Sequence, residues 1–120
     1  MYKILGVDDA GFMRKMVQTH LSKAGYTDFL EGEDGVRAVD IYKETKPDLV
    51  IMDITMPNLN GIEALRQIKA FDAEAKVVMC SAMGQEAMVM EAIKLGALDF
   101  IVKPFKAERI VQTVNKVLPL

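Results

Sequence analysis

Residues that could take part in phosphoryl chemistry stand directly after four short apolar runs of the sequence. Two adjacent carboxylates follow the first run, a third carboxylate follows another, and a hydroxyl and an ammonium follow the last two. In order, these residues are Asp8 and Asp9, Asp53, Ser81 and Lys103. A carboxylate can attack a phosphoryl group to form an acyl phosphate, and a lysine and a hydroxyl can hold phosphoryl oxygens. The sequence therefore predicts phosphoryl chemistry, provided that the fold brings these residues together.

Three carboxylates in one crevice repel each other unless a cation lies among them. A hard divalent ion with oxygen ligands would relieve this repulsion, and Mg²⁺ is the common intracellular choice. Mg²⁺ usually keeps several waters and binds through few carboxylates together with phosphate oxygens. The sequence thus predicts a magnesium site that a phosphoryl group completes.

The elements that must position these residues alternate between strand length and helical period. The expected strands are Lys3–Val7, Thr27–Glu31, Leu49–Met52, Val77–Cys80 and Phe100–Val102. Three expected helices are Val36–Glu44, Ile62–Ala70 and Ala87–Leu95. A first helix is expected to have one apolar face, formed by Met13, Met16, Val17, His20, Leu21 and Ala24. A last helix is expected to have a similar face, formed by Ala107, Ile110, Val111, Val114 and Val117. Strict alternation predicts an α/β fold with a five-stranded parallel sheet and helices on both faces. Ligands bind beyond the carboxyl ends of such strands, where the polar residues above are expected.

Composition limits the classes of protein that the chain could be. A length of 120 residues fits one domain, and a hydrophobic content of 51% is enough for a core. The net charge is −2 and no long basic run occurs, which argues against a nucleic-acid surface. No stretch approaches the roughly 18 apolar residues of a membrane span, so a cytoplasmic protein without membrane contact is expected.

Two smaller features lead to separate expectations. Acidic residues gather between Asp28 and Asp34, and we interpret them as a solvated edge. Gly6 inside the first strand leaves either a gap or room for a close approach, and His20 lies on an apolar helix face. One hypothesis is that His20 fills the gap at Gly6.

Each candidate site residue has a simpler explanation when it is considered alone. Asp8 or Asp9 could cap the first helix, as aspartates after strands often do. Ser81 could also be a cap, and Lys103 could be a solvated surface charge. Convergence of all five residues on one edge of an alternating α/β domain favours a shared site.

Several short motifs resemble the receiver domains of two-component response regulators. They are Val7-Asp8-Asp9, Asp53-Ile54-Thr55-Met56-Pro57 followed by Asn60-Gly61, Cys80-Ser81-Ala82 and Val102-Lys103-Pro104-Phe105. The resemblance covers essentially the whole chain and is specific in combination. Within the family, the chain is most similar to the stand-alone regulators of chemotaxis. The resemblance implies a flavodoxin-like, doubly wound sheet with strand order 2-1-3-4-5.

The resemblance also implies a role for each site residue. Asp53 would be the phosphoacceptor. Asp9, Asp53 and the backbone carbonyl of Thr55 would ligate Mg²⁺. Asp8 would contribute to the metal site mainly through water.

Three further residues receive roles from the same resemblance. Lys103 would pair with the phosphoryl group, and its peptide bond to Pro104 would be cis. Ser81 would be the switch hydroxyl. Phe100 would occupy the aromatic switch position, although simple core packing is a competing explanation.

The resemblance further implies the kind of signalling in which the chain takes part. Residues 1–120 would form a single receiver domain without an output domain, acting as a monomer through protein contacts. A CheA-type histidine kinase would supply the phosphoryl group, and a flagellar motor switch protein would receive the signal. A phosphatase is a further candidate partner. The protein would catalyse only its own phosphorylation and dephosphorylation and would not be an enzyme in the usual sense.

Other functions remain as alternatives. A phosphohydrolase of the haloacid dehalogenase type also uses a nucleophilic aspartate at a strand end, but no second aspartate stands two residues after Asp53. A flavin carrier would need a hydroxyl- and glycine-rich loop where Asp8 and Asp9 stand. A nucleotide switch would need a glycine-rich phosphate loop ending in lysine and serine or threonine, which is absent from the sequence. A receiver in a phosphorelay or in another pathway is the nearest alternative.

Overall fold

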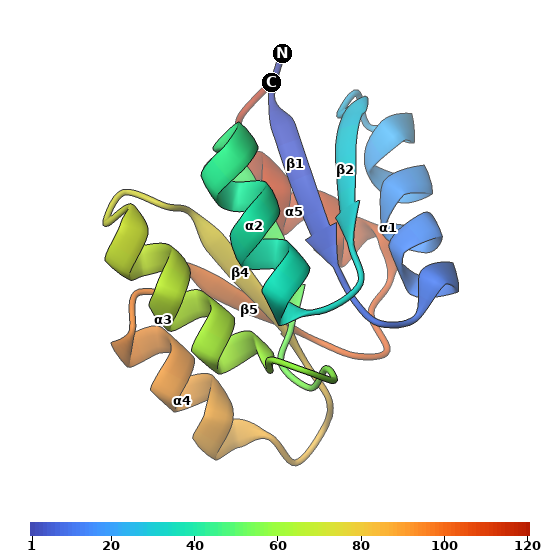
Figure 1. The fold of residues 1–120 in the computed structure, drawn as a ribbon. Coiled ribbons are helices and arrows are strands. Elements are labelled where there is room, and N and C mark those ends of the chain that lie inside the picture. The colour runs from blue at the N-terminus through green and yellow to red at the C-terminus, as the bar shows by residue number, and fades with distance from the viewer.

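The central sheet has five parallel strands in the order β2-β1-β3-β4-β5, in a computed structural model that describes residues 1–120 (Figure 1). The strands are β1 (Lys3–Val7), β2 (Asp28–Gly32), β3 (Leu49–Asp53), β4 (Val77–Ser81) and β5 (Asp99–Val102). The helices are α1 (Gly11–Lys23), α2 (Gly35–Thr45), α3 (Gly61–Phe71), α4 (Glu86–Lys94) and α5 (Ala107–Val117). This architecture confirms the predicted α/β fold and its strand order.

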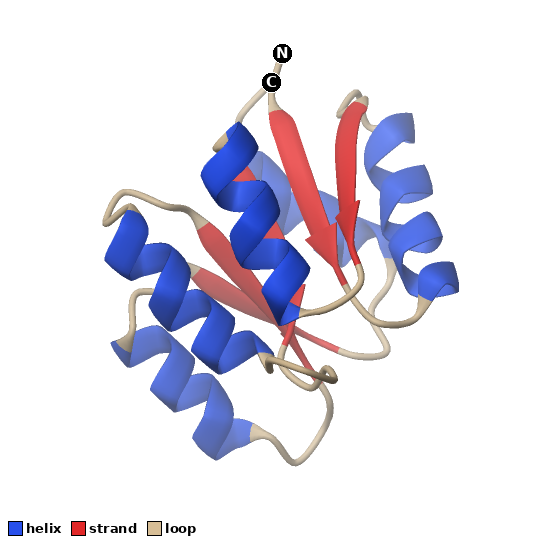
Figure 2. Cartoon of the chain, in the orientation of Figure 1, coloured by secondary structure: helices blue, strands red, loops and turns tan.

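Helices cover both faces of the sheet (Figure 2). Between the sheet and the helices lie two separate hydrophobic cores. Helices α2, α3 and α4 pack on one face, against side chains such as Leu5 and Met52. Helices α1 and α5 pack on the other face, against side chains such as Ile4 and Ile51. Because successive strand residues point to opposite faces and both faces are buried, the inner strands β1, β3 and β4 are apolar without alternation. No helix in either layer is long and apolar enough to cross a membrane.

The strand boundaries differ from the sequence-based prediction in ways that matter for the site. The second strand starts and ends one residue later than predicted, because its ladder to β1 runs from Asp28 beside Lys3 to Gly32 beside Val7. The third and fourth strands each extend one residue further and end on Asp53 and Ser81. These two side chains therefore stand on the last residues of regular strands, whose backbone positions the sheet holds.

The gap at Gly6 is filled by a residue from the neighbouring strand. A Cβ atom on Gly6 would overlap the ring of Phe29 on β2. The hypothesis that His20 fills this space is therefore wrong. The glycine permits close approach of an aromatic ring, which packs with the core between the sheet and helices α1 and α5.

Candidate functional site

The structure brings the five predicted site residues to one edge of the sheet. Asp8 and Asp9 follow β1, Asp53 ends β3, Ser81 ends β4 and Lys103 follows β5. These four strands are neighbours in the sheet. All four are parallel, so their carboxyl ends meet at the same edge, as the fold rule for ligand sites requires.

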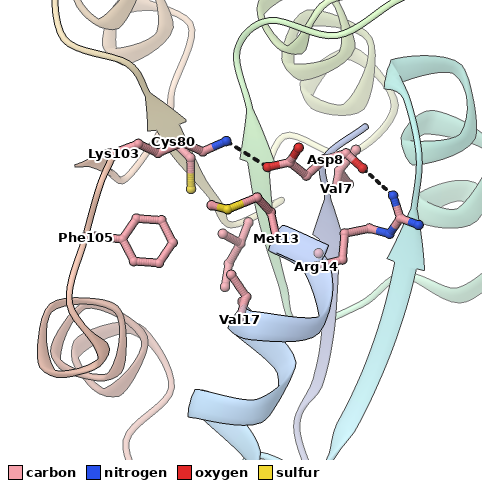
Figure 3. Close-up of a pocket in the computed structure, with 10 residues that line it drawn as sticks. Val7, Asp8, Met13, Arg14, Val17, Cys80, Lys103 and Phe105 are labelled. Carbon is pink, nitrogen blue, oxygen red and sulfur yellow. Dashed lines mark hydrogen bonds and ion pairs between the residues drawn. The ribbon is translucent and has the colours of Figure 1, made fainter. Parts of the chain in front are cut away.

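Lys103 lies between two of the three carboxylates. Its Nζ is 2.8 Å from Asp8 Oδ2 and 3.2 Å from Asp53 Oδ2. Figure 3 shows the ammonium directed from the end of β5 toward Asp8. The exposed fraction of the side chain is only 23%, so the solvated surface charge considered for Lys103 is excluded. The peptide bond from Lys103 to Pro104 is cis, which confirms the prediction.

The charges in this cluster change the proton affinity of both partners. Burial raises the pKa of the Asp53 carboxyl; the positive charge of Lys103 opposes this rise, and the negative charge of Asp8 adds to it. Burial alone would lower the pKa of Lys103, but the hydrogen bond to Asp8 and the charges of Asp53 and Asp8 outweigh it and raise the pKa. Lys103 is therefore held as a cation beside a carboxylate whose charge is only partly compensated.

The three carboxylates are close enough to share one cation. Oxygen atoms of Asp8, Asp9 and Asp53 lie within 4.8 Å of one another. Asp8 is buried, Asp53 is half-buried and Asp9 is exposed, so the cluster opens from the protein interior toward solvent. A set of carboxylate oxygens with an open side suits Mg²⁺, which prefers oxygen ligands and retains water.

The backbone after β1 is fixed by an arginine that the sequence analysis did not single out. Arg14 on α1 donates through Nη1 to the carbonyl oxygen of Asp8 at 2.5 Å (Figure 3). Its Nε donates to Glu31 Oε1 at 3.0 Å. The amide of Ala10 donates to Asp8 Oδ1 at 2.9 Å. Ala10 is the N-cap residue of α1, and no side chain caps that helix. Neither Asp8 nor Asp9 is therefore the helix cap that the simpler explanation proposed.

The loop after β3 is anchored to helix α2 by another residue whose role the sequence analysis missed. Asp34, expected on a solvated edge, is instead buried. One of its carboxylate oxygens accepts from the Arg37 amide at 2.9 Å and caps α2, and the other accepts from Asn58 Nδ2 at 2.7 Å. These hydrogen bonds, led by that from the Arg37 amide, lower the pKa of Asp34. The signal in the sequence was the helix-cap preference of an aspartate just before a helical run.

A glutamine bridges the two loops beside Asp53. Gln85 Nε2 donates to Thr55 Oγ1 at 2.8 Å, and its Oε1 accepts from the Ala82 amide at 2.6 Å. Thr55 lies two residues after Asp53, and Ala82 directly follows Ser81. The family resemblance implied a metal-binding carbonyl for Thr55, and the sequence indicated no role for Gln85, because nothing local connects positions 30 residues apart.

Ser81 and Phe100 border a common groove. The Ser81 residue is only 1% exposed, and it cannot cap α4, which begins at Glu86. Phe100 is half-buried and packs against the core on the face of α2, α3 and α4. Both line a groove of about 370 Å³ along α4 and β5, whose other apolar walls are Ala82, Met83, Val89, Met90, Ile93 and Val102. Phe100 is thus part core and part groove wall, and its role as a switch stays a prediction.

The fold and the acidic edge are those of a receiver domain, and comparison with known proteins agrees. The chain matches the response regulator receiver domain over residues 4–115 and belongs to that family. It is 56% identical to the chemotaxis protein CheY of Bacillus subtilis over 98% of both chains, and 56% identical to CheY of Thermotoga maritima over 96% of both. A crystal structure of the CheX–CheY–BeF3–Mg²⁺ complex from Borrelia burgdorferi contains a chain that superimposes with a TM-score of 0.92 and 36% identity, covering 99% of this chain and 90% of that one. The chain is therefore a CheY-like response regulator receiver domain.

Proposed function

We propose that this receiver is a chemotaxis phospho-switch that accepts a phosphoryl group on Asp53 with Mg²⁺ bound by the acidic cluster. The observation that carries the proposal is the position of Lys103, whose ammonium lies within 3.2 Å of both Asp8 and Asp53. A fixed cation beside a strand-end carboxylate can hold the negative charge of an incoming phosphoryl group. The similarity to CheY proteins over nearly the whole chain supports the pathway.

The chemical step transfers a phosphoryl group from a donor to the chain's own carboxylate. An oxygen of Asp53 attacks the phosphorus, the bond from phosphorus to the donor atom breaks, and the donor leaves with that electron pair. Lys103 then pairs with a phosphoryl oxygen. Attack by water on the phosphorus later releases inorganic phosphate and restores the carboxylate. The protein thus acts on itself and turns over no separate substrate.

Mg²⁺ fits the residues present because they offer clustered carboxylate oxygens. On this proposal, Asp9, Asp53 and the backbone carbonyl of Thr55 would hold the ion, and Asp8 would act through water. Bound Mg²⁺ would neutralise charge that develops on the phosphoryl oxygens.

The output of the proposed switch is the surface formed by α4, β5 and α5, which includes the groove along α4 and β5. Ser81 moves toward the phosphoryl group to donate a hydrogen bond, and Phe100 turns into the space that this movement opens. The groove then differs in shape between the two states, so a partner that prefers one state shifts the equilibrium. By analogy with the CheY relatives, we assign the kinase role to a CheA-type protein, the target role to a flagellar motor switch protein, and the site of action to the cytoplasm.

The proposal is tested by chemical phosphorylation in vitro. Incubation with acetyl phosphate and Mg²⁺ should add one acid-labile phosphoryl group, detected by intact mass spectrometry, and chelation of the metal should prevent the addition. Asp53→Asn should abolish it. Asp40→Asn, on the exposed side of α2, is the matched control and should label like the unmodified chain. Unchanged labelling of Asp53→Asn would show that the phosphoacceptor is another residue.

A further inference from the structure

Gln85 occupies a place in the molecule that the chemistry of the site does not explain. Its side-chain amide joins the loop after β3, at Thr55, to the loop after β4, at Ala82. We propose that Gln85 is a positioning residue whose side-chain hydrogen bonds favour the unphosphorylated arrangement of the site. When phosphorylation disrupts that arrangement, Gln85 passes the change on to the start of helix α4. This inference rests on the proposed phosphorylation of Asp53 and adds a second connection between the site and the α4 surface, beside Phe100.

The location of Gln85 couples the site directly to the start of α4. Gln85 is the N-cap residue of that helix, yet its side chain does not cap it. The amide group reaches back over the preceding loop, and its Nε2 also lies 3.9 Å from Met88 Sδ in the first turn of α4. The backbone carbonyl of Gln85 accepts the first helical hydrogen bond, from Val89. A change in the side-chain contacts of Gln85 therefore acts on the first turn of the helix that lines the groove.

The rest of the loop after β4 offers little other restraint. Met83 is 81% exposed. Gly84 has a φ of +90°, and no atom lies within 4 Å of the position that a Cβ would take. The loop thus depends on the Gln85 amide for its tie to the rest of the site.

Movement of Ser81 would strain this tie. Ala82 is joined to Ser81 by a peptide bond, so a displacement of Ser81 toward Asp53 carries the Ala82 amide with it. If Gln85 stays on Thr55, the 2.6 Å bond from the Ala82 amide to Gln85 has to change in length or angle. If Gln85 follows Ala82, its 2.8 Å bond to Thr55 has to change instead. Hydrogen bonds present in only one of two states bias the equilibrium toward that state.

The direct test compares the affinity of variants for beryllofluoride, a phosphoryl mimic, in the presence of Mg²⁺. Gln85→Ala removes the hydrogen bonds to Thr55 and Ala82, together with the weak 3.9 Å contact to Met88 Sδ. It should bind the mimic about three- to tenfold more tightly, the effect expected when one or two partly exposed hydrogen bonds are lost from the competing state. Gln85→Met keeps the side-chain length and should behave in the same way. Gln67→Ala, an exposed glutamine on α3, is the matched control and should leave the affinity unchanged.

A second readout separates this role from a merely structural one. In amide NMR spectra without the mimic, the signals of the first turn of α4 in Gln85→Ala should lie part of the way toward their positions in the beryllofluoride-bound unmodified chain. Thr55→Val removes one end of the bridge. Its effect on affinity should therefore largely disappear when it is combined with Gln85→Ala, because neighbouring groups in one network are not additive.

The outcomes distinguish this inference from the proposed function. If the unmodified chain binds beryllofluoride but Gln85→Ala and Gln85→Met match it in affinity and in α4 spectra, the role of Gln85 is wrong and phosphorylation of Asp53 stands. If the effects of Thr55→Val and Gln85→Ala on beryllofluoride affinity are additive, the two side chains do not act together, and the inference is also wrong. If the unmodified chain neither binds the mimic nor accepts phosphate at Asp53, the proposed function fails and this inference fails with it.

Discussion

Two loops flank Asp53, and they are held in different ways. The loop after β3, residues 54–60, is tied to α2 by Asn58, which donates to Asp34, and by the Gly35 amide, which donates to the Leu59 carbonyl at 3.1 Å. It closes on itself where the Gly61 amide donates to Ile54 at 2.7 Å. The loop after β4, residues 82–85, is tied across the site only by the side chain of Gln85.

The difference separates two tasks at one site. A nucleophile has to stay in line with its target, so a firmly anchored strand end suits Asp53. A hydroxyl that reports phosphorylation has to move, so the loosely tied loop that directly follows Ser81 suits this task. We therefore expect substitutions in the anchored loop to cost more stability than equivalent substitutions in the loop after β4.

The largest expected effect comes from a matched pair of glycine substitutions. A Cβ on Gly61 would overlap the backbone carbonyl oxygen of Asp53, so Gly61→Ala should force β3 and α3 apart. We expect a loss of about 3 kcal/mol in the free energy of unfolding, as for other overpacked sites, together with weaker phosphorylation. Gly84→Ala meets no atom and should cost only the strain of its positive φ, about 1–2 kcal/mol.

Urea unfolding of both variants measures this contrast, and acetyl phosphate labelling reports on the site. A larger loss of stability in Gly84→Ala than in Gly61→Ala would reverse the comparison between the loops.

A smaller effect is expected from the anchor on α2. Asp34→Ala removes the helix cap and the acceptor for Asn58, and should lower the free energy of unfolding by about 1–2 kcal/mol at neutral pH. The pKa of Asp34 is lowered in the folded protein, so its stabilisation is present above the unfolded-state pKa, near 4, and is lost as pH falls through the lower folded-state value. The difference between Asp34→Ala and the unmodified chain should therefore shrink in acid.

Unfolding curves at neutral pH and at about pH 3 test this dependence. Glu33→Ala changes the exposed neighbouring acid and should stay within about 0.5 kcal/mol of the unmodified chain. A full loss that persists in acid would mean that Asp34 acts through packing rather than through its charge.

The smallest expected effect is a gain in stability when Asp53, which the two loops flank, is replaced. The pKa of Asp53 is raised in the folded protein, so its ionised form destabilises the fold above that pKa, and the penalty fades as pH falls through it. Without metal, Asp53→Asn should be more stable at neutral pH by about 1 kcal/mol, the order of one close charge contact in water. The advantage should disappear in acid.

Thermal unfolding with and without Mg²⁺ provides the control for this variant. Saturating metal should stabilise the unmodified chain, by about 2.7 kcal/mol at one hundred times the dissociation constant, and should stabilise Asp53→Asn much less. Equal stabilisation of both by Mg²⁺ would place the metal away from Asp53.

The sequence by itself determined the fold class and which residues lie at the site edge of the sheet. Short apolar runs that alternate with helix-period segments left a parallel sheet as the consistent arrangement, and parallel strands bring their carboxyl ends together. Asp8, Asp9, Asp53, Ser81 and Lys103 could be identified because each stands within two residues of the end of such a run. Strand ends are a local property of the chain, and local patterns can be read from one sequence.

Only the tertiary structure decided which side chains pair with each other. Lys103 contacts Asp8 across 95 positions of the chain, Asn58 contacts Asp34 across 24, and Gln85 contacts Thr55 across 30. The side chain that packs on Gly6 also comes from another strand: it is Phe29 on β2, and not His20 on α1. No periodicity encodes such partners, because each depends on the distance between two backbones that the packed sheet and helices set together.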